Sequence, residues 1–334
     1  MRSRAQAVLT GLALCGGALG AVGGCEPSAG PGSPPPSATP ATSVPAATGV
    51  APQAGSAATS AGPAPRASAP AAITALSPLT SLRPGPFMAT TADGERFVVT
   101  LATKGNPRPY RRPLAFYRLA QTLGYDQVPR TELRRLPTGK VSQLLPSAPE
   151  VRQYLAGRAT VTNDGTIAAL LVQHVPGKQA QLVDDQRLAR WAELASSADP
   201  IPAAERGYVR DYVAVLVLDY LAGNVERRSV IIAERGGRLA AADNRTAFPG
   251  YVSPESLDIP LGRLEQVIRF PKDLKRVLAD LDRETVTRQL IRGRFEDRLL
   301  GPRQLTDLME RRATVMTLLE SRLLQYGDPT VLSL

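Results

Sequence analysis

Two acidic side chains, those of Glu226 and Asp243, stand on either side of a predicted β-hairpin over residues 229–242. Because the two strands of a hairpin are antiparallel, its two ends lie together, and we expect the two carboxylates to meet. In phosphoryl transfer such a pair has two tasks: one carboxylate orients the attacking hydroxyl, and the other holds Mg²⁺ against the phosphates. The spacing therefore indicates phosphotransfer chemistry as a first hypothesis.

The helix that precedes this hairpin is predicted to be buried. Residues 206–223 (RGYVRDYVAVLVLDYLAG) are apolar on nearly every helical face, which is typical of a helix inside a core. A buried helix determines the position of the segment that follows it, here residues 224–227. We therefore expect this polar loop and the hairpin to be positioned by the core.

The remaining segments predict an α+β fold with two lobes. Strand patterns dominate a small first lobe over residues 85–176, and helical patterns dominate a larger second lobe over 177–334. The Pro-Gly pair at 176–177 marks the hinge between them. The elements expected in the first lobe are a hairpin over 86–102, a helix over 112–124, and strands over 127–136 and 165–177.

The order of these motifs resembles that of the atypical kinase superfamily, which includes HipA-type toxin kinases, phosphatidylinositol kinases and secretory-pathway kinases of the Four-jointed group. In that family a helix ends Asp-aromatic-apolar, an Asn-x-Asp-Arg loop and a hairpin follow, and the hairpin ends in Asp-Asn. This chain has DYL at 219–221, NVER at 224–227 and ADNRTAF at 242–248. Upstream, 94–102 and 111–129 match the family's phosphate-binding strand and the helix beside it. The resemblance implies a two-lobed protein-kinase-like fold, with ATP and Mg²⁺ as cofactors.

Several departures from the family pattern bear on activity. By resemblance, Glu226 occupies the position of the catalytic Asp, Thr100 that of the phosphate-binding Lys, and Pro113 that of the glutamate which pairs with the Lys. The extra methylene of Glu moves its carboxylate by about 1 Å, which can lower a rate on the order of 10²-fold. Without the Lys, no fixed cation faces the developing phosphate charge. Lys104 lies roughly 13 Å further along an extended strand, so only a bend would bring it to the phosphates.

Among the main catalytic positions Asp243 alone is unchanged, and we expect it to be the metal ligand. We therefore expect only weak binding of Mg²⁺ and ATP. The resemblance assigns a degenerate catalytic loop to Asn224, Glu226 and Arg227, and nucleotide binding to Asp243, Asn244, Thr100 and Lys104.

Three functions are consistent with this pattern. The leading hypothesis is a pseudokinase that binds a nucleotide or an unidentified protein partner without turnover. The second is a divergent active kinase that phosphorylates exported proteins or envelope molecules. The third is an envelope scaffold that binds no nucleotide, in which Asp243 caps a turn and Glu226 pairs with Arg227 or Arg228.

The N-terminal residues predict export and a lipid anchor. A basic start precedes an apolar run over residues 7–22, which is too short for a permanent membrane span and is typical of a cleaved signal peptide. The run ends in VGGC, which resembles a bacterial lipobox and ends at Cys25. We expect residues 1–24 to be the signal peptide and Cys25 to carry lipid in the cell envelope. Glu26, where an Asp would favour the inner membrane, favours the outer membrane.

Residues 25–84 are predicted to be a disordered tether. They consist mainly of Ala, Pro, Ser, Gly and Thr, with too little bulky apolar surface to offset the entropy of ordering.

Of the two cysteines, Cys15 would leave with the signal peptide and Cys25 would be lipidated, so we expect no disulfide.

The chain is basic, with a formal net charge of +10, which favours anionic headgroups or phosphorylated ligands. Nucleic acid is not an expected partner, because aromatic residues make up 5% of the chain and no basic stretch is interleaved with them. The arginine pairs at 111–112 and 311–312 are expected on solvated helix faces.

Cys25→Ser should abolish lipidation, because the thiol is the group that would carry the diacylglycerol. We expect the variant to incorporate no labelled fatty acid and to leave the membrane fraction. Cys15→Ser is the matched control and should remain lipidated, since the bulky Leu14 before it does not suit the cleavage site. Label retained by Cys25→Ser would contradict the lipobox assignment.

Overall fold

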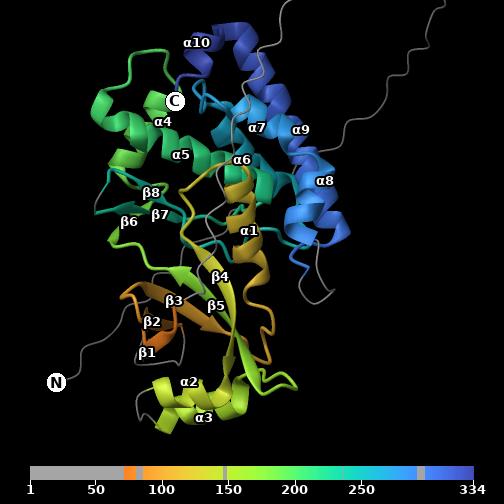
Figure 1. Ribbon diagram of the computed structural model, residues 1–334. Helices are drawn as coiled ribbons and strands as arrows, with labels where there is room; N and C mark the ends of the chain where they lie inside the picture. The colour runs from red at the N-terminus through yellow and green to blue at the C-terminus, as the bar shows by residue number, and fades with distance from the viewer. Residues whose placement is uncertain (1–70, 80–85, 146–148, 235, 292–297) are drawn as a thin grey trace, which may run out of the picture. The chain divides into compact units, whose positions relative to one another are not determined.

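The computed structural model describes residues 71–79, 86–145, 149–234, 236–291 and 298–334 (Figure 1). The chain divides into two units, Met1–Arg66 and Ala67–Leu334, and every described residue belongs to the second. The predicted signal peptide, Cys25 and most of the predicted tether lie outside the described residues. None of the described helices combines the length and the apolar surface that a transmembrane span requires.

The first lobe is built on a five-stranded antiparallel sheet with strand order β1-β2-β3-β5-β4 (Figure 1). The predicted hairpin over 86–102 is confirmed as β2 and β3, and Gly94, with φ of 81°, supplies the left-handed turn residue. The two other predicted strands are confirmed with shorter bounds. The five strands are β1 (Ile73–Pro78), β2 (Phe87–Thr91), β3 (Arg96–Leu101), β4 (Thr131–Pro137) and β5 (Thr166–Gln173).

Strand β1 corrects the predicted tether. It lies within residues 25–84, so the prediction of disorder is wrong for this part of the segment. Its two bulky apolar residues, Ile73 and Leu76, are buried in the core of the sheet. An edge strand also gains backbone hydrogen bonds from its neighbour, here β2, so it needs fewer apolar side chains than a central strand. The folded part therefore begins before residue 85.

Strand β5 separates two hydrophobic cores, which explains why its sequence is apolar throughout. Ile167, Ala169 and Leu171 face a small core between the sheet and helix α2. Leu170 and Val172, which alternate with them, face the large core. Two helices that the sequence does not predict, α2 (Thr138–Leu144) and α3 (Pro149–Arg158), lie between β4 and β5 in the chain.

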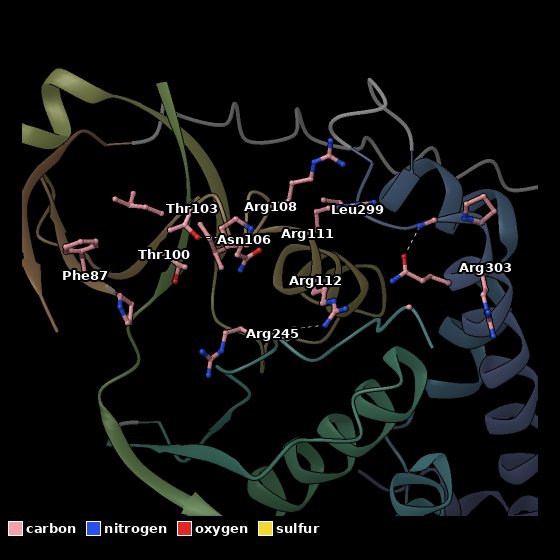
Figure 2. Close-up of a pocket in the computed structure, with 18 residues that line it drawn as sticks. Phe87, Thr100, Thr103, Asn106, Arg108, Arg111, Arg112, Arg245, Leu299 and Arg303 are labelled. Carbon is pink, nitrogen blue, oxygen red and sulfur yellow. Dashed lines mark hydrogen bonds between the residues drawn. The ribbon is translucent and has the colours of Figure 1, made fainter. Parts of the chain in front are cut away.

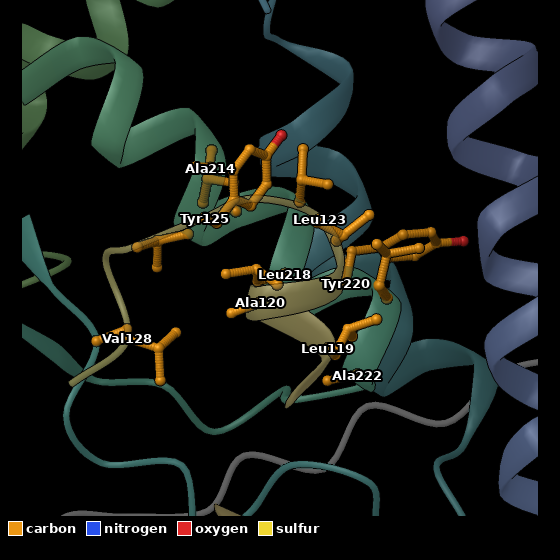
Figure 3. Packing of buried hydrophobic residues seen from close by; sticks show 14 of the residues in the cluster. Leu119, Ala120, Leu123, Tyr125, Val128, Ala214, Leu218, Tyr220 and Ala222 are labelled. Carbon is orange, nitrogen blue, oxygen red and sulfur yellow. The ribbon is translucent and has the colours of Figure 1, made fainter. Parts of the chain in front are cut away.

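Helix α1 (Arg111–Thr122) links the two lobes and confirms the helix predicted over 112–124. Its residues Leu119 and Ala120, with Leu123 just after it, belong to the large core and pack beside Leu218 and Ala222 of α5 (Figure 3). The helix therefore places residues that follow β3 directly against the core of the second lobe.

The second lobe is organised around α5 (Ala203–Ala222), in which every residue from Asp211 to Ala222 is buried. This confirms the prediction of a buried helix. The other helices of this lobe are α4 (Gln186–Ala195), α6 (Pro254–Glu265), α7 (Leu274–Asp280), α8 (Arg283–Val286), a π-helical turn (Thr287–Ile291), α9 (Pro302–Tyr326) and α10 (Asp328–Val331).

A three-stranded antiparallel sheet, ordered β6-β7-β8, lies beside α5. Its strands are β6 (Gly177–Gln181), β7 (Ser229–Ala233) and β8 (Leu239–Ala240). Strands β7 and β8 confirm the predicted hairpin. Strand β6 is not predicted, because Ala180 is its single buried apolar residue and its pairing with β7 relies on the backbone.

Gly177→Ala should destabilise the fold at the hinge. A Cβ atom at Gly177 would lie 2.3 Å from the carbonyl oxygen of Ile232, so β6 and β7 would have to separate. We expect a loss of about 1–3 kcal/mol in the free energy of unfolding, measured by urea denaturation. Gly105→Ala is the control, because a Cβ there meets no atom within 4 Å. Equal midpoints for the two variants would contradict this account of the hinge.

Candidate functional site

A buried ion pair holds the loop between α5 and β7. The Asp219 carboxylate of α5 accepts hydrogen bonds from Nε of Arg227 and, at 2.8 Å, from Nδ2 of Asn224. The side chains of Arg227 and Asp219 are only 2% and 6% exposed. Burial raises the pKa of Asp219, while the charge and hydrogen bonds of Arg227 act in the opposite direction. The Arg227 guanidinium also lies 5.4 Å from the ring centroid of Phe116 in α1.

Arg227 also holds the far end of the hairpin. Its guanidinium donates to the backbone oxygen of Asp243 at 3.2 Å and to Oδ1 of Asn244. Asn244 in turn donates to the backbone oxygen of Ala241 at 2.8 Å, and Thr246 donates to Asn224. Asn224, Arg227 and Asn244, which the sequence assigned to catalysis or cofactor binding, therefore have their polar groups occupied within the scaffold.

The hairpin places Glu226 and Asp243 on the wall of one cavity. Both line a cavity of about 590 Å³, which we call the loop cavity; it is also lined by Gln179, Gln181 and Arg245. Glu226 is exposed, and among the described residues it has no hydrogen bond or ion pair, so it pairs with neither of the arginines that follow it.

Asp243 is engaged by Arg245. Nε and Nη2 of Arg245 lie 2.9 Å and 2.8 Å from the two carboxylate oxygens of Asp243, in a bidentate ion pair. The Arg245 hydrogen bonds hold the pKa of Asp243 below its usual range. The Asp243 carboxylate is therefore ionised, and its negative charge is paired with the positive charge of Arg245 in the same turn.

A second cavity, of about 270 Å³, lies between the lobes and is called the cleft here. Val98 and Thr100 of β3, Pro113 of α1 and Asp243 all contribute to its walls. Thr100 and Pro113 therefore lie at the same cavity, as expected for the positions of the family's Lys and its Glu partner. Neither side chain carries a charge, so this part of the cleft has no Lys–Glu ion pair.

Lys104 does not fill this gap. Strand β3 ends at Leu101, and Lys104 is exposed in the turn beyond it, where its backbone N–H donates to the backbone oxygen of Arg158 at 2.8 Å. It lines none of the cavities described around the lobes. The position of Lys104 thus contradicts its predicted role in nucleotide binding.

A third cavity, of about 880 Å³, adjoins the cleft and is strongly basic (Figure 2). We call it the arginine cavity. Thr100, Leu170 and Arg245 line both it and the cleft. Its five arginines come from the start of α1, from the turn after Asp243 and from the start of α9: Arg108, Arg111, Arg112, Arg245 and Arg303.

The prediction of solvated helix faces is confirmed for Arg112, which is exposed, and is wrong for Arg311. Arg111 and Arg112 line the arginine cavity. Arg311 is buried, with 8% exposure, and its Nε donates to the backbone oxygen of Leu221 at 2.8 Å, near the C-terminus of α5. Helical periodicity indicates which residues share a face, but it does not indicate the element that this face meets.

Solved structures with the same fold are kinases. A Fam20 protein of hydra, solved with sugar, aligns with a TM-score of 0.56 and 16% identity over 78% of this chain and 88% of its own. The Golgi casein kinase with Mn/ADP bound aligns with a TM-score of 0.53 and 16% identity over 79% and 76%. A second structure of the Golgi casein kinase gives 0.52 at the same identity and coverage. The fold is the atypical kinase-like fold of these Fam20 kinases.

The predicted α+β, two-lobed kinase-like architecture is thereby confirmed. No protein-family model matches this chain, and no curated protein matches it. At 16% identity the likeness establishes the fold alone.

The kinase-like fold implies a divalent metal ion, and the described side chains do not by themselves form a complete set of ligands for one. No group of three or more His, Cys, Asp or Glu residues within the described ranges is placed to hold a metal. Mg²⁺ requires near-octahedral oxygen ligands, usually with one or two carboxylates from the protein. Here Arg245 already bridges the Asp243 carboxylate, and among the described residues that line the loop cavity Glu226 is the other acidic one.

Arg227→Met should destabilise the protein strongly while keeping most of the apolar stem. Removing one partner of a buried ion pair leaves the other charge uncompensated, which costs about 3–5 kcal/mol. Arg190→Met is the control, because Arg190 and its partner Glu193 are 48% and 69% exposed, and such pairs contribute less than about 1 kcal/mol. Chemical denaturation of both variants measures the difference. A loss for Arg227→Met no larger than for the control would refute the scaffold role of the pair.

Proposed function

We propose that this chain is a pseudokinase whose kinase-like domain binds a phosphorylated ligand, with a nucleotide as the first candidate, and does not transfer phosphate efficiently. The observation that carries the proposal is the presence of Thr100 and Pro113 together at the cleft, where the family has its Lys–Glu pair. An apolar wall is retained there, while the fixed cation beside it is lost.

The catalytic contributions that are missing here are large, which supports a loss of turnover. Removing one preorganised electrostatic group from an active site lowers kcat by about 10²–10³. Glu226 in place of Asp displaces the catalytic carboxylate and adds a further loss on the order of 10²-fold. Arg245 competes with a metal ion for the Asp243 carboxylate, but this ion pair is 77% and 60% exposed and contributes less than about 1 kcal/mol, so the third contribution is weakened only slightly.

The cleft retains features suited to a base. Its apolar walls come from three strands: Val98 of β3, Val172 of β5 and Ile231 of β7. His174 lies beside them at the hinge. Burial lowers the pKa of His174, and the charge of Arg96 acts in the same direction, so the ring is neutral at pH 7. A flat, uncharged ring system is the ligand that such walls accommodate. The Mn/ADP in one structural neighbour supports the same assignment.

A divergent active kinase is the second candidate. The observation that favours it is that Glu226 shares the loop cavity with Asp243 and has no partner among the described residues, so its carboxylate is available to a hydroxyl substrate. Exported proteins or envelope molecules would be its substrates.

We further propose that the domain acts in the cell envelope, anchored by lipid at Cys25 and sorted by Glu26 to the outer rather than the inner membrane, where a protein partner would bind it. The VGGC sequence that ends at Cys25 and the residue after it support this part of the proposal.

Nucleotide titration and phosphate transfer to a generic acceptor should separate these functions. We expect the wild type to bind ATP without detectable transfer, and Glu226→Asp to gain no activity, because Thr100 still supplies no cation. Glu193→Ala, a change at an exposed carboxylate on α4, is the control for Glu226→Ala. Turnover in the wild type that Glu226→Ala abolishes and Glu193→Ala keeps would establish the active kinase. Absence of binding in every variant would leave the scaffold.

A further inference from the structure

Among the described residues, four of the five arginines of the arginine cavity form no ion pair with a carboxylate. Five arginines line the cavity, and no acidic residue is among the described residues of its wall (Figure 2). Arg108, Arg112 and Arg303 form no ion pair with a carboxylate within the described part of the chain.

Arg245 pairs with the Asp243 carboxylate, but the contacts of the other arginines with described residues do not balance their charge. Nε of Arg111 donates to the backbone oxygen of Arg298 at 3.0 Å, and Nη1 of Arg112 donates to that of Arg245 at 3.5 Å. Arg303 lies over the ring of Tyr251, with 5.4 Å to its centroid. All of these acceptors are uncharged. Burial, reinforced by the charge of Arg108, lowers the pKa of Arg111, which is the direction expected where cations crowd together.

The position of these arginines at the N-terminus of a helix makes their positive charge still less favourable. Arg111 and Arg112 are in the first turn of α1, which contains no acidic residue. The positive end of a helix dipole lies there, and basic side chains at this end are unfavourable. An arrangement that is unfavourable in the empty protein becomes favourable when an anion occupies the cavity.

The cleft and the arginine cavity are adjacent and share lining residues. Thr100 and Leu170 line both, and Arg245 lines these two and the loop cavity as well. A ligand whose apolar part occupies the cleft can therefore extend an anionic part to the arginines. Nε and Nη2, along one edge of the Arg245 guanidinium, donate to the Asp243 carboxylate, which holds that cation at the junction.

We propose that the arginine cavity binds the di- or triphosphate of the ligand directly, and that these guanidinium groups take the place of both the missing Lys and the divalent metal. The inference rests on the proposed function and specifies its ligand as a metal-free polyphosphate. Guanidinium groups form bidentate hydrogen bonds with phosphate oxygens, which suits them to this role. Mg²⁺ should compete, because a chelated triphosphate has less negative charge and brings a cation into a basic cavity.

Calorimetric titration of the purified full-length protein tests this. In EDTA the wild type should bind ATP, and excess Mg²⁺ should weaken binding several-fold. Arg108→Gln and Arg112→Gln should each weaken ATP binding roughly tenfold, because each removes a charged hydrogen bond to phosphate. Arg190→Gln on α4 is the control for the change in net charge and should bind as the wild type does. Equal melting temperatures would show that the variants remain folded.

Asp243→Asn distinguishes arginine binding from metal binding. If arginines bind the phosphates, this variant should bind ATP in EDTA at least as tightly as the wild type, because a negative charge beside the site is removed. Binding that requires Mg²⁺ and is lost in Asp243→Asn, while Arg108→Gln and Arg112→Gln bind normally, would overturn the inference and leave the proposed function intact.

Two further ligands identify the source of the phosphates. Binding of ATP tighter than inorganic tripolyphosphate, with weak binding of adenosine, is expected for a nucleotide. Tripolyphosphate binding as tightly as ATP would support the arginine site and overturn the nucleotide as its ligand. Absence of binding by all three, with or without Mg²⁺, would overturn both the inference and ligand binding in the proposed function. Phosphate transfer by the wild type would overturn the pseudokinase assignment alone.

Discussion

The geometry of the site depends on two buried acidic residues of α5. Asp219 binds Arg227 before the hairpin, and Asp211 accepts hydrogen bonds from Nε of Arg238 at 2.6 Å and from the backbone N–H of Leu239 at 3.1 Å, at the start of β8. The two carboxylates thus fix both strands of the hairpin to the most buried helix of the protein. Buried ion pairs often stabilise a fold no better than apolar residues of the same volume. Their contribution here is positional, since no apolar contact would specify where Asp243 and Glu226 emerge.

The residues that hold the loop and hairpin in place therefore differ from the residues that face the cavities. The residues that preserve the family pattern, such as Asp219, Asn224 and Arg227, have their polar groups bonded inside the protein, where a change would leave a charge or an amide without a partner. Glu226 and Thr100 face cavities, where a substitution alters catalysis at little cost to the fold. A kinase-like fold can therefore persist after its catalytic side chains have changed, which is why its presence does not by itself establish phosphotransfer.

The sequence predicts the elements that have strong local patterns. The hairpin around Gly94, the buried helix α5 and the hairpin of β7 and β8 all follow from periodicity and turn chemistry, and the structure bears them out. Strands β1 and β6 are missed because backbone pairing with a neighbour, rather than an apolar pattern of their own, holds them. The arginine cavity is missed because its residues come from segments far apart in the chain, and no local pattern brings the start of α1 to the start of α9.

Arg245 lines the cleft, the loop cavity and the arginine cavity, and it also binds the Asp243 carboxylate. In a site built for metal-dependent transfer, the carboxylate after the hairpin must be available to a cation that arrives with the substrate. Here a cation of the protein itself, two residues further on, occupies that carboxylate and also faces the cleft and the arginine cavity. The positive charge thus belongs to a side chain of the protein and is present before any ligand binds. A site of this kind is preorganised to hold an anion, because its cations need no ordering or recruitment when the ligand arrives.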